Sequence, residues 1–510
     1  MNMLIGYGAV ALFFLLVVAV LERSHRRAGT FTDYAVAGRS FGSWYQTMSF
    51  LNTWLPGSIF IAFTGLAAGS GAIGFYYLPY SLLAVVLMFF MAQRVHDWGR
   101  RFDLRTQADF LGLRFGSRRV RSVAAVIGIV SSFPWMVLGL QSLGLVFSYL
   151  SFGNVSPDAA ILIGIGVLAV RQIWTVRMGM RGVVISDMVQ GLVAYVLGLC
   201  VIVGLLVWML TNGHGLDQVP GGHFAIPGPG SPVGPLYVMS IILTGAVGGW
   251  CWPDIFVRLF TARSTAAIKK SAVQAAPILF VFATALTMLG ILAAGLPGVS
   301  DAPDQVWFIT AGVGGTALVA LAGVIVLAAT MGNVDANMQA CGAQFSNDVL
   351  RGGNGDGGTD DGRETRSARL AIVALTVLAA AVAMATSKDS SGLSNLAIIS
   401  YQGICQLAPA LLLGIFWRRG TAAGAIGGMV TGFAVAAALQ VAYPVSIPWL
   451  GGLTSGVAGL VLNTAIYVAA ALLAPGPDAE RARVAALFDA PPAAGHRLPG
   501  VRPADVTAGP

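Results

Sequence analysis

Apolar runs of about 20 residues recur along almost the whole chain, and short polar segments separate them. A helix needs about 20 apolar residues to cross the hydrocarbon core of a bilayer. The sequence therefore predicts an all-α integral membrane protein with about 13 transmembrane helices. The predicted spans are residues 2–21, 44–69, 72–93, 121–150, 158–175, 183–210, 234–257, 271–296, 306–347, 368–387, 393–417, 421–442 and 449–474. Gly312, Gly314 and Gly315 are expected to divide the long run from 306 into a short outer piece and the span itself.

The scarcity of charge excludes several other classes of protein. Only 10% of the residues are charged, whereas soluble domains carry about 25%. The net charge of +8 does not indicate a nucleic-acid partner, because the basic residues lie in the gaps between apolar runs. The 4 cysteines lie inside apolar runs and the 5 histidines in loops or the tail, without metal-ligand, triad or phosphate-loop spacing. We therefore expect a protein surrounded by membrane lipid, with no enzyme activity, no cofactor and no nucleic-acid partner.

The lysines and arginines give the expected orientation in the membrane. Positively charged loops are retained on the cytoplasmic side. With the predicted spans, all of the 30 Lys and Arg residues except Lys388 fall on one side. We therefore predict a multi-pass protein of the inner membrane, with its N-terminus outside and its C-terminus in the cytoplasm.

Two polar segments interrupt the apolar pattern. The Gly/Asp-rich stretch 351–366 and the Pro/Ala-rich tail 476–510 lack the apolar periodicity that a folded core needs, so we expect both to be disordered. Residues 1–475 then form a single transmembrane domain, with no soluble domain attached and no obligate protein partner.

Helix-breaking residues lie in the middle of two predicted spans. The second span contains NTWLPGS at Asn52–Ser58, and the seventh contains GAVGGWCWP at Gly245–Pro253. An interrupted helix is tolerated in a membrane where it is buried in protein or lines a wet cavity. Breaks at corresponding positions in two halves of a chain indicate the midplane binding site of a transporter.

The two breaks divide the chain into two five-helix repeats. Each repeat begins with an interrupted helix, at about 44–210 and at about 234–417. Because each repeat has an odd number of helices, the second repeat is inverted relative to the first. The accessory helices are then 2–21, 421–442 and 449–474.

Two acidic residues lie well inside predicted spans, namely Asp187 in VVISDMVQ and Asp335 in MGNVDANMQA. A carboxylate is costly to bury in a membrane, so such residues indicate a function in the interior of the helix bundle. Asp254 and Arg258 lie one helical turn apart, and we expect them to form an ion pair at a helix end.

Four segments resemble the sodium:solute symporter family, which includes bacterial carriers of proline, pantothenate, sialic acid, sugars and monocarboxylates. They are DYAVAGRSFGSW at 33–44, GMRGVVISDMVQ at 179–190, FVRLFTARSTAAIKKSA at 256–272 and LAATMGNVDANMQACGAQFSNDVL at 327–350. The resemblance covers about residues 30–475. It implies a leucine-transporter-like fold with inverted repeats and alternating access.

The resemblance also implies a primary sodium site between the first broken helix and the ninth span. Its carbonyl ligands fall on Asn52, Leu55 and Ala329, and its two hydroxyl positions fall on Gly332 and Asn333. Glycine has no side-chain oxygen, and one amide oxygen replaces only one of the two hydroxyls. We therefore expect sodium to bind poorly at this position.

The auxiliary cation site of the family falls on Asp187, and Asp335 of the ninth span is its expected partner. Two neighbouring carboxylates disfavour double ionisation, so one of them is expected to hold a proton. Proton coupling through these two residues is the favoured hypothesis, and sodium at a displaced site is the alternative.

The substrate pocket implied by the resemblance lies between the two breaks. An aromatic lining, with no lysine or arginine inside the membrane, is typical of a site for a small solute. The expected lining residues are Trp54, Pro56, Gly57, Ser58, Trp135, Gln141, Trp250, Trp252, Tyr401 and Gln406.

We therefore expect a secondary active transporter that couples a proton or sodium gradient to the symport of a small organic solute, such as an amino acid or a monocarboxylate. The alternative is a transporter-like membrane sensor that binds a small solute and signals to a partner. The lack of a predicted signalling domain favours the transporter.

Overall fold

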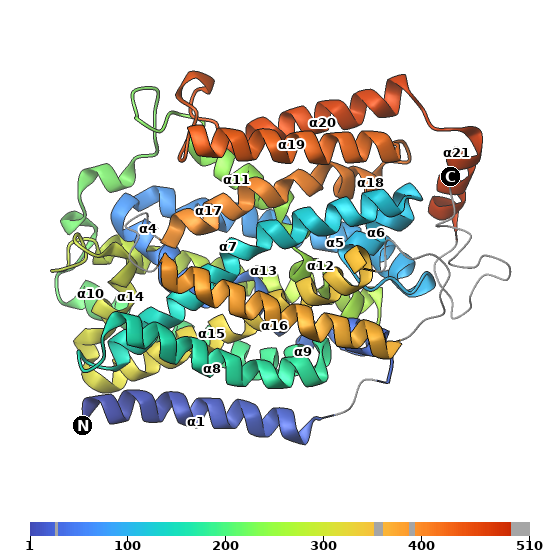
Figure 1. Cartoon of the computed structure of the whole chain (residues 1–510). Coiled ribbons are helices and arrows are strands. Elements are labelled where there is room, and N and C mark those ends of the chain that lie inside the picture. The colour runs from blue at the N-terminus through green and yellow to red at the C-terminus, as the bar shows by residue number, and fades with distance from the viewer. Residues whose placement is uncertain (26–28, 351–360, 387–392, 491–510) are drawn as a thin grey trace.

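Long helices lie side by side and run in roughly one direction through the molecule (Figure 1). The computed structural model describes residues 1–25, 29–350, 361–386 and 393–490. Helix α1 (Asn2–Arg23) lies at one edge of the bundle, and α19 (Ala422–Ala442) and α20 (Ser455–Leu473) lie at the opposite edge. Within the described residues, helices are joined by turns and loops, and β-structure is limited to isolated bridges.

The described residues contain 11 helical segments that are long and apolar enough to cross a membrane, or 12 if a bent pair is counted as one span. The predicted count of 13 is not confirmed. Helix α3 (Ser43–Trp54) has only 12 residues, so the second predicted span consists of two short helices, α3 and α4 (Ala62–Ser70), on either side of a break. The helical conformation is interrupted again at Gly71, which has φ 60° and ψ −121°, before α5 (Tyr77–Arg101) begins in the third predicted span. Further helices between the two breaks are α5 (Tyr77–Arg101), α6 (Gln107–Phe115), α7 (Arg118–Leu150), α8 (Pro157–Met178), α9 (Met180–Gly191) and α10 (Gly198–Thr211). Between the second break and the C-terminal pair of helices lie, among others, α13 (Thr265–Ala293), α16 (Asp361–Ala385), α17 (Leu393–Ile404) and α18 (Gly414–Phe416).

The first predicted break is present between α3 and α4 (Ala62–Ser70). Leu55 leaves the helical conformation, with φ −110° and ψ 73°, and Pro56 is extended. A β-carbon added to Gly57 would lie 1.9 Å from the Thr330 hydroxyl and 2.4 Å from the Val326 carbonyl oxygen. Glycine is therefore required for the broken segment to pack this closely against the ninth predicted span.

The second predicted break separates α11 (Tyr237–Gly248) from α12 (Pro253–Thr261) with a bend of 47°. Trp252 is extended, and Pro253 begins the next helix, where its missing N–H costs nothing. A β-carbon on Gly249 would lie 2.4 Å from the Trp54 ring. The two broken helices therefore meet in the interior of the bundle.

Helix α15 (Gly315–Gln344) packs against both breaks and is buried along most of its length. The short helix α14 (Val306–Ala311) precedes it, and a turn at Gly312–Gly314 separates the two. The predicted division of the run from 306 is thus confirmed.

The predicted disorder of the polar segments is wrong for the parts that the structure describes. Helix α21 (Asp478–Asp489) lies in the tail, and its Arg483 donates hydrogen bonds of 2.8 and 2.9 Å to the carbonyls of Leu113 and Arg114 in α6. Helix α16 begins at Asp361, so 361–366 are helical. Residues 351–360 and 491–510, and Lys388, lie outside the described residues. The repeat boundaries and the orientation in the membrane stay predictions.

Candidate functional site

A small cavity lies where the two broken helices meet α7, α15 and α17. Its volume is about 20 Å³, which is room for about one water molecule. It is lined by Thr53, Trp54, Trp135, Trp252, Asp254, Ile255, Asn333, Asn337 and Tyr401. A solute larger than water therefore needs these side chains to move apart.

Aromatic rings form one wall of this cavity. The ring centroids of Trp135 and Trp252 are 5.7 Å apart, those of Trp135 and Tyr401 are 5.9 Å apart, and those of Trp252 and Tyr401 are 5.3 Å apart. Trp54 closes another side and donates a hydrogen bond of 2.8 Å to Ser81. Edge-to-face packing of this kind fixes the rings relative to one another.

Of the ten residues predicted to contact substrate, Trp54, Trp135, Trp252 and Tyr401 line the cavity, and the other six do not. Three of the six are engaged elsewhere. Trp250 donates to the Ala84 carbonyl, Gln141 donates to Thr386, and Gln406 donates to the Gly456 carbonyl of α20. Pro56, Gly57 and Ser58 form the turn of the first break.

Four polar residues that line the cavity were not predicted to contact substrate. Thr53 and Asn333 are joined by a hydrogen bond of 2.9 Å from the Asn333 amide to the Thr53 carbonyl, and Asn333 was predicted only as a cation ligand. Asp254 and Asn337 come from α12 and α15. Their positions in the sequence could have indicated a place in the cavity, since Asp254 directly follows the second break and Asn337 lies one helical turn after Asn333.

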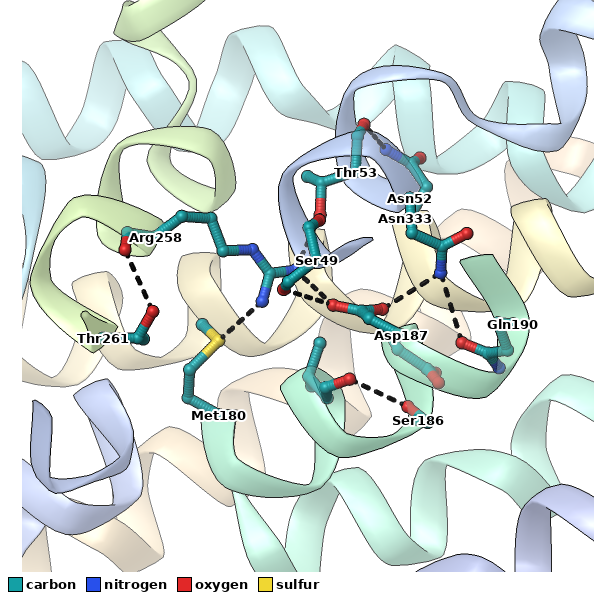
Figure 2. A network of polar contacts seen from close by, with 12 residues as sticks. Ser49, Asn52, Thr53, Met180, Ser186, Asp187, Gln190, Arg258, Thr261 and Asn333 are labelled. Atoms are coloured by element: carbon teal, nitrogen blue, oxygen red, sulfur yellow. Dashed lines mark hydrogen bonds and ion pairs between the residues drawn. The ribbon is translucent and has the colours of Figure 1, made fainter. Parts of the chain in front are cut away.

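Asp187 lies beside the cavity at the centre of a polar network (Figure 2). It is completely buried. Its carboxylate accepts hydrogen bonds of 2.6 Å from Ser49 and 3.0 Å from Asn52, and it forms an ion pair of 3.2 Å with Arg258. Arg258 also donates to the Thr53 hydroxyl at 2.7 Å. The Asp187 charge is thus compensated within the protein.

Asp335 is also completely buried and has its own arginine. Arg171 forms an ion pair of 3.1 Å with it, and Gln172 donates a hydrogen bond of 2.9 Å. Arg171 further donates to Ser186, which precedes Asp187 on α9. The two ion pairs therefore lie next to each other.

Two predictions about these charges are wrong. Arg171 and Arg258 are buried within membrane-length segments, so the expected absence of intramembrane arginine does not hold. Arg258 forms its ion pair with Asp187 rather than with Asp254. Asp187 and Asp335 each pair with a different arginine, and a cation site shared by the two carboxylates stays a prediction.

Two of the five positions of the predicted primary sodium site already accept hydrogen bonds from protein groups. The Tyr195 hydroxyl donates 2.6 Å to the Leu55 carbonyl, and the Trp135 indole donates 3.1 Å to the Asn333 side chain. At Gly332, the position that a β-carbon would take lies 1.7 Å from the Asn52 side-chain nitrogen, which is a hydrogen-bond donor and not a cation ligand. Ala329, whose backbone carbonyl is a predicted ligand, is completely buried. The poor binding of sodium at this position stays a prediction.

A second polar cluster ties helix ends together at the end of the bundle where α6 and α21 lie (Figure 1). Arg121 of α7 pairs with Asp109 of α6 at 2.9 Å and with Asp348 at 2.5 Å. Thr106 donates 2.6 Å to Asp348. These contacts join α6 and α7 to the helical segment Phe345–Leu350 that follows α15.

Membrane-length helices with two breaks that meet at a buried polar cavity define a secondary transporter. The sequence profile of the Sodium:solute symporter family matches residues 34–432, and the chain belongs to this family. It is therefore a symporter-type membrane protein and not an enzyme.

Three similar proteins illustrate the match. The chain is 24% identical to a monocarboxylate transport permease protein of Rhizobium johnstonii, covering 83% of this chain and 87% of the relative. It is 24% identical to a sodium/proline symporter of Staphylococcus aureus, covering 84% of each. The structure of a Na⁺-coupled sialic acid symporter in a substrate-bound outward-open state matches with a TM-score of 0.70 and 17% identity, covering 93% of this chain and 98% of that one. The predicted leucine-transporter-like fold is thereby confirmed.

Proposed function

We propose that this protein carries a small organic solute across the inner membrane by cation-coupled symport, and that the solute binds in the cavity between the two helix breaks. The observation that carries the proposal is the convergence of both broken helices on one buried cavity with aromatic and polar walls. Broken helices present unpaired backbone groups and helix termini, which bind polar solutes in the middle of a membrane.

The small size of the cavity supports an alternating-access cycle. The cavity between the breaks has a volume of only about 20 Å³, so an organic solute needs a conformation in which the cavity is wider. In such a cycle the cavity opens to one side of the membrane when the aromatic wall separates, and to the other side, in a different step, when the ion-paired helix ends around Arg121 separate. Such gating motions set the rate of many carriers.

Membership of the family supports sodium as the coupling cation. Proton binding shared by Asp187 and Asp335 loses support, because an arginine already compensates each carboxylate. Because the Leu55 carbonyl and the Asn333 side chain already accept from protein donors and Gly332 has no side-chain oxygen, we expect a driving sodium ion to use at least some ligands outside the set that the resemblance implies.

Uptake into proteoliposomes tests the proposal. Purified protein is reconstituted and given a panel of radiolabelled amino acids and monocarboxylates, once with an imposed sodium gradient and once with a pH gradient of equal driving force. Accumulation above that of protein-free vesicles under the sodium gradient is expected. Accumulation that follows only the pH gradient would restore the proton hypothesis.

The alternative function is a membrane sensor that binds a small solute. It predicts saturable binding to the purified protein and no accumulation under either gradient. Binding without uptake in vesicles that a reconstituted sodium/proline symporter fills under the same conditions would favour the sensor and refute the transporter.

A further inference from the structure

A carboxylate oxygen and an amide nitrogen in the cavity have no partner. Oδ1 of Asp254 and Nδ2 of Asn337 are buried, and neither has a hydrogen-bond partner among the described residues. Asp254 is only 2% exposed and Asn337 only 1%, and both line the cavity between the breaks. Most buried polar groups in native proteins are hydrogen-bonded. Two such groups in one cavity are therefore available to a ligand that enters it.

Asp254 makes no direct ion pair with the arginine one turn further along α12. The guanidinium of that arginine, Arg258, contacts Asp187 at 3.2 Å and the Thr53 hydroxyl at 2.7 Å, so Asp187 and Asp254 share its charge at different distances. Among the described residues, no ion pair within 4.0 Å is formed by Asp254. A buried carboxylate without a direct cation partner is costly, so the cavity favours a positively charged group beside Asp254.

The aromatic walls of the cavity also favour a positively charged group. Trp135, Trp252 and Tyr401 surround the space next to Asp254. The faces of such rings attract ammonium groups, by about 0.5–2 kcal/mol. The Asn337 amide donates hydrogen bonds and thus requires an acceptor on the ligand.

We propose that Asp254 and Asn337 are the polar contacts of the transported solute, and that the solute carries a protonated amine together with a hydrogen-bond acceptor, as an amino acid does. The Asp254 carboxylate accepts from the ammonium group, and the Asn337 amide donates to the acceptor. A monocarboxylate without an amine would place a second negative charge beside Asp254 in a medium of low dielectric constant, where repulsion is strong. This inference rests on the proposed function for the location of the site and selects the class of solute.

Thermal unfolding of the purified wild-type protein with matched pairs of compounds tests the proposal without any transport step. The pairs are L-alanine with propionate, L-leucine with 4-methylpentanoate, and L-phenylalanine with 3-phenylpropionate, all in potassium buffer and again in sodium buffer. A ligand that binds the folded state raises the unfolding temperature by mass action. We expect at least one amino acid to stabilise the protein and its deaminated partner to have no effect.

Two variants assign the effect to the cavity. Asp254→Asn keeps the shape of the side chain and is expected to weaken amino-acid binding by at least about tenfold, the effect typical of a lost hydrogen bond to a charged group. Asp301→Asn, on an exposed residue outside the cavity, is the matched control and should bind like the wild type. Gel filtration verifies that each variant is folded.

Several outcomes would overturn the proposal. They are stabilisation by the deaminated compounds, stabilisation by no amine in either buffer, and amino-acid binding that Asp254→Asn leaves unchanged. Stabilisation by sodium alone that disappears in Asp254→Asn would assign the carboxylate to an inorganic cation and would also overturn it. Amino-acid binding without vesicle uptake would instead refute the proposed transport and leave the class of ligand standing.

Discussion

Asp187 and Asp254 are both buried carboxylates at the meeting point of the broken helices, but their surroundings are opposite. Asp187 has two hydrogen-bond donors and an arginine. Asp254 lines a cavity, and one of its oxygens has no hydrogen-bond partner among the described residues. A compensated carboxylate holds helices together, whereas an uncompensated one is available to a ligand.

The difference shows why burial alone does not identify a binding residue. Asp187 joins α3, α9 and α12 through Ser49, Asn52 and Arg258 (Figure 2). Its charge is therefore part of the scaffold in this conformation. Asp254 makes no direct ion pair among the described residues, and under our proposal its charge is available to the solute.

The largest expected effect comes from removing the partner of the compensated carboxylate. Arg258→Met leaves Asp187 buried with an unpaired charge, which typically costs about 3–5 kcal/mol of stability. The unfolding temperature of the purified protein should fall steeply. The double variant Arg258→Met with Asp187→Leu removes both charges and should recover most of the loss. An unchanged unfolding temperature in the single variant would show that the ion pair contributes nothing.

A smaller effect is expected from adding a hydroxyl at the predicted sodium position. In Gly332→Ser the new β-carbon would lie 1.7 Å from the Asn52 amide nitrogen, so Asn52 must move and lose its bond to Asp187. Overpacking of this kind costs about 1–3 kcal/mol. Adding Asn52→Ala vacates most of this space and should recover part of the loss in unfolding temperature, since the β-carbon would still lie 2.9 Å from the Asp187 carboxylate. No rescue by the second change would contradict the assignment of the clash to Asn52.

The next largest loss of stability is expected at the contact between the aromatic wall of the cavity and helix α15. Trp135→Phe keeps a ring in the aromatic wall but removes the 3.1 Å hydrogen bond to Asn333. We expect a loss of about 1 kcal/mol, measured as a lower midpoint of chemical unfolding. Trp208→Phe, on a ring that stacks with His214 away from the cavity, serves as the control and should change the midpoint less.

Much of the fold was predictable because its signals are local. The breaks are predicted by Pro56, Gly57 and Pro253, and the membrane spans are predicted by the length of the apolar runs. The aromatic residues that directly adjoin the breaks, Trp54 and Trp252, were likewise assigned to the cavity that they line.

The partners of the buried charges were not predictable, because a sequence shows neither how deep a side chain lies in the bundle nor which way it points. Arg171 and Arg258 lie near the ends of apolar runs and looked like loop residues, yet long side chains carry their charges into the bundle interior. Gln406 lies on a helix near the cavity but bonds to Gly456, and only the packing of α20 decides this. Asp254 was assigned to Arg258 by sequence spacing, although Asp187 on another helix takes that arginine.

The smallest stability effect is expected at the uncompensated carboxylate, where the effect on binding is largest. Asp254→Asn removes a charge that has no ion-pair partner among the described residues and keeps the volume of the side chain, so the free energy of unfolding in the absence of solute should change by less than about 1 kcal/mol or rise slightly. The measurement is the unfolding temperature of the purified variant beside that of Asp187→Asn, which loses an ion pair and should be clearly less stable. A drop for Asp254→Asn as large as that for Asp187→Asn would show that Asp254 belongs to the scaffold, because a carboxylate reserved for a ligand stabilises the protein only when the ligand is bound.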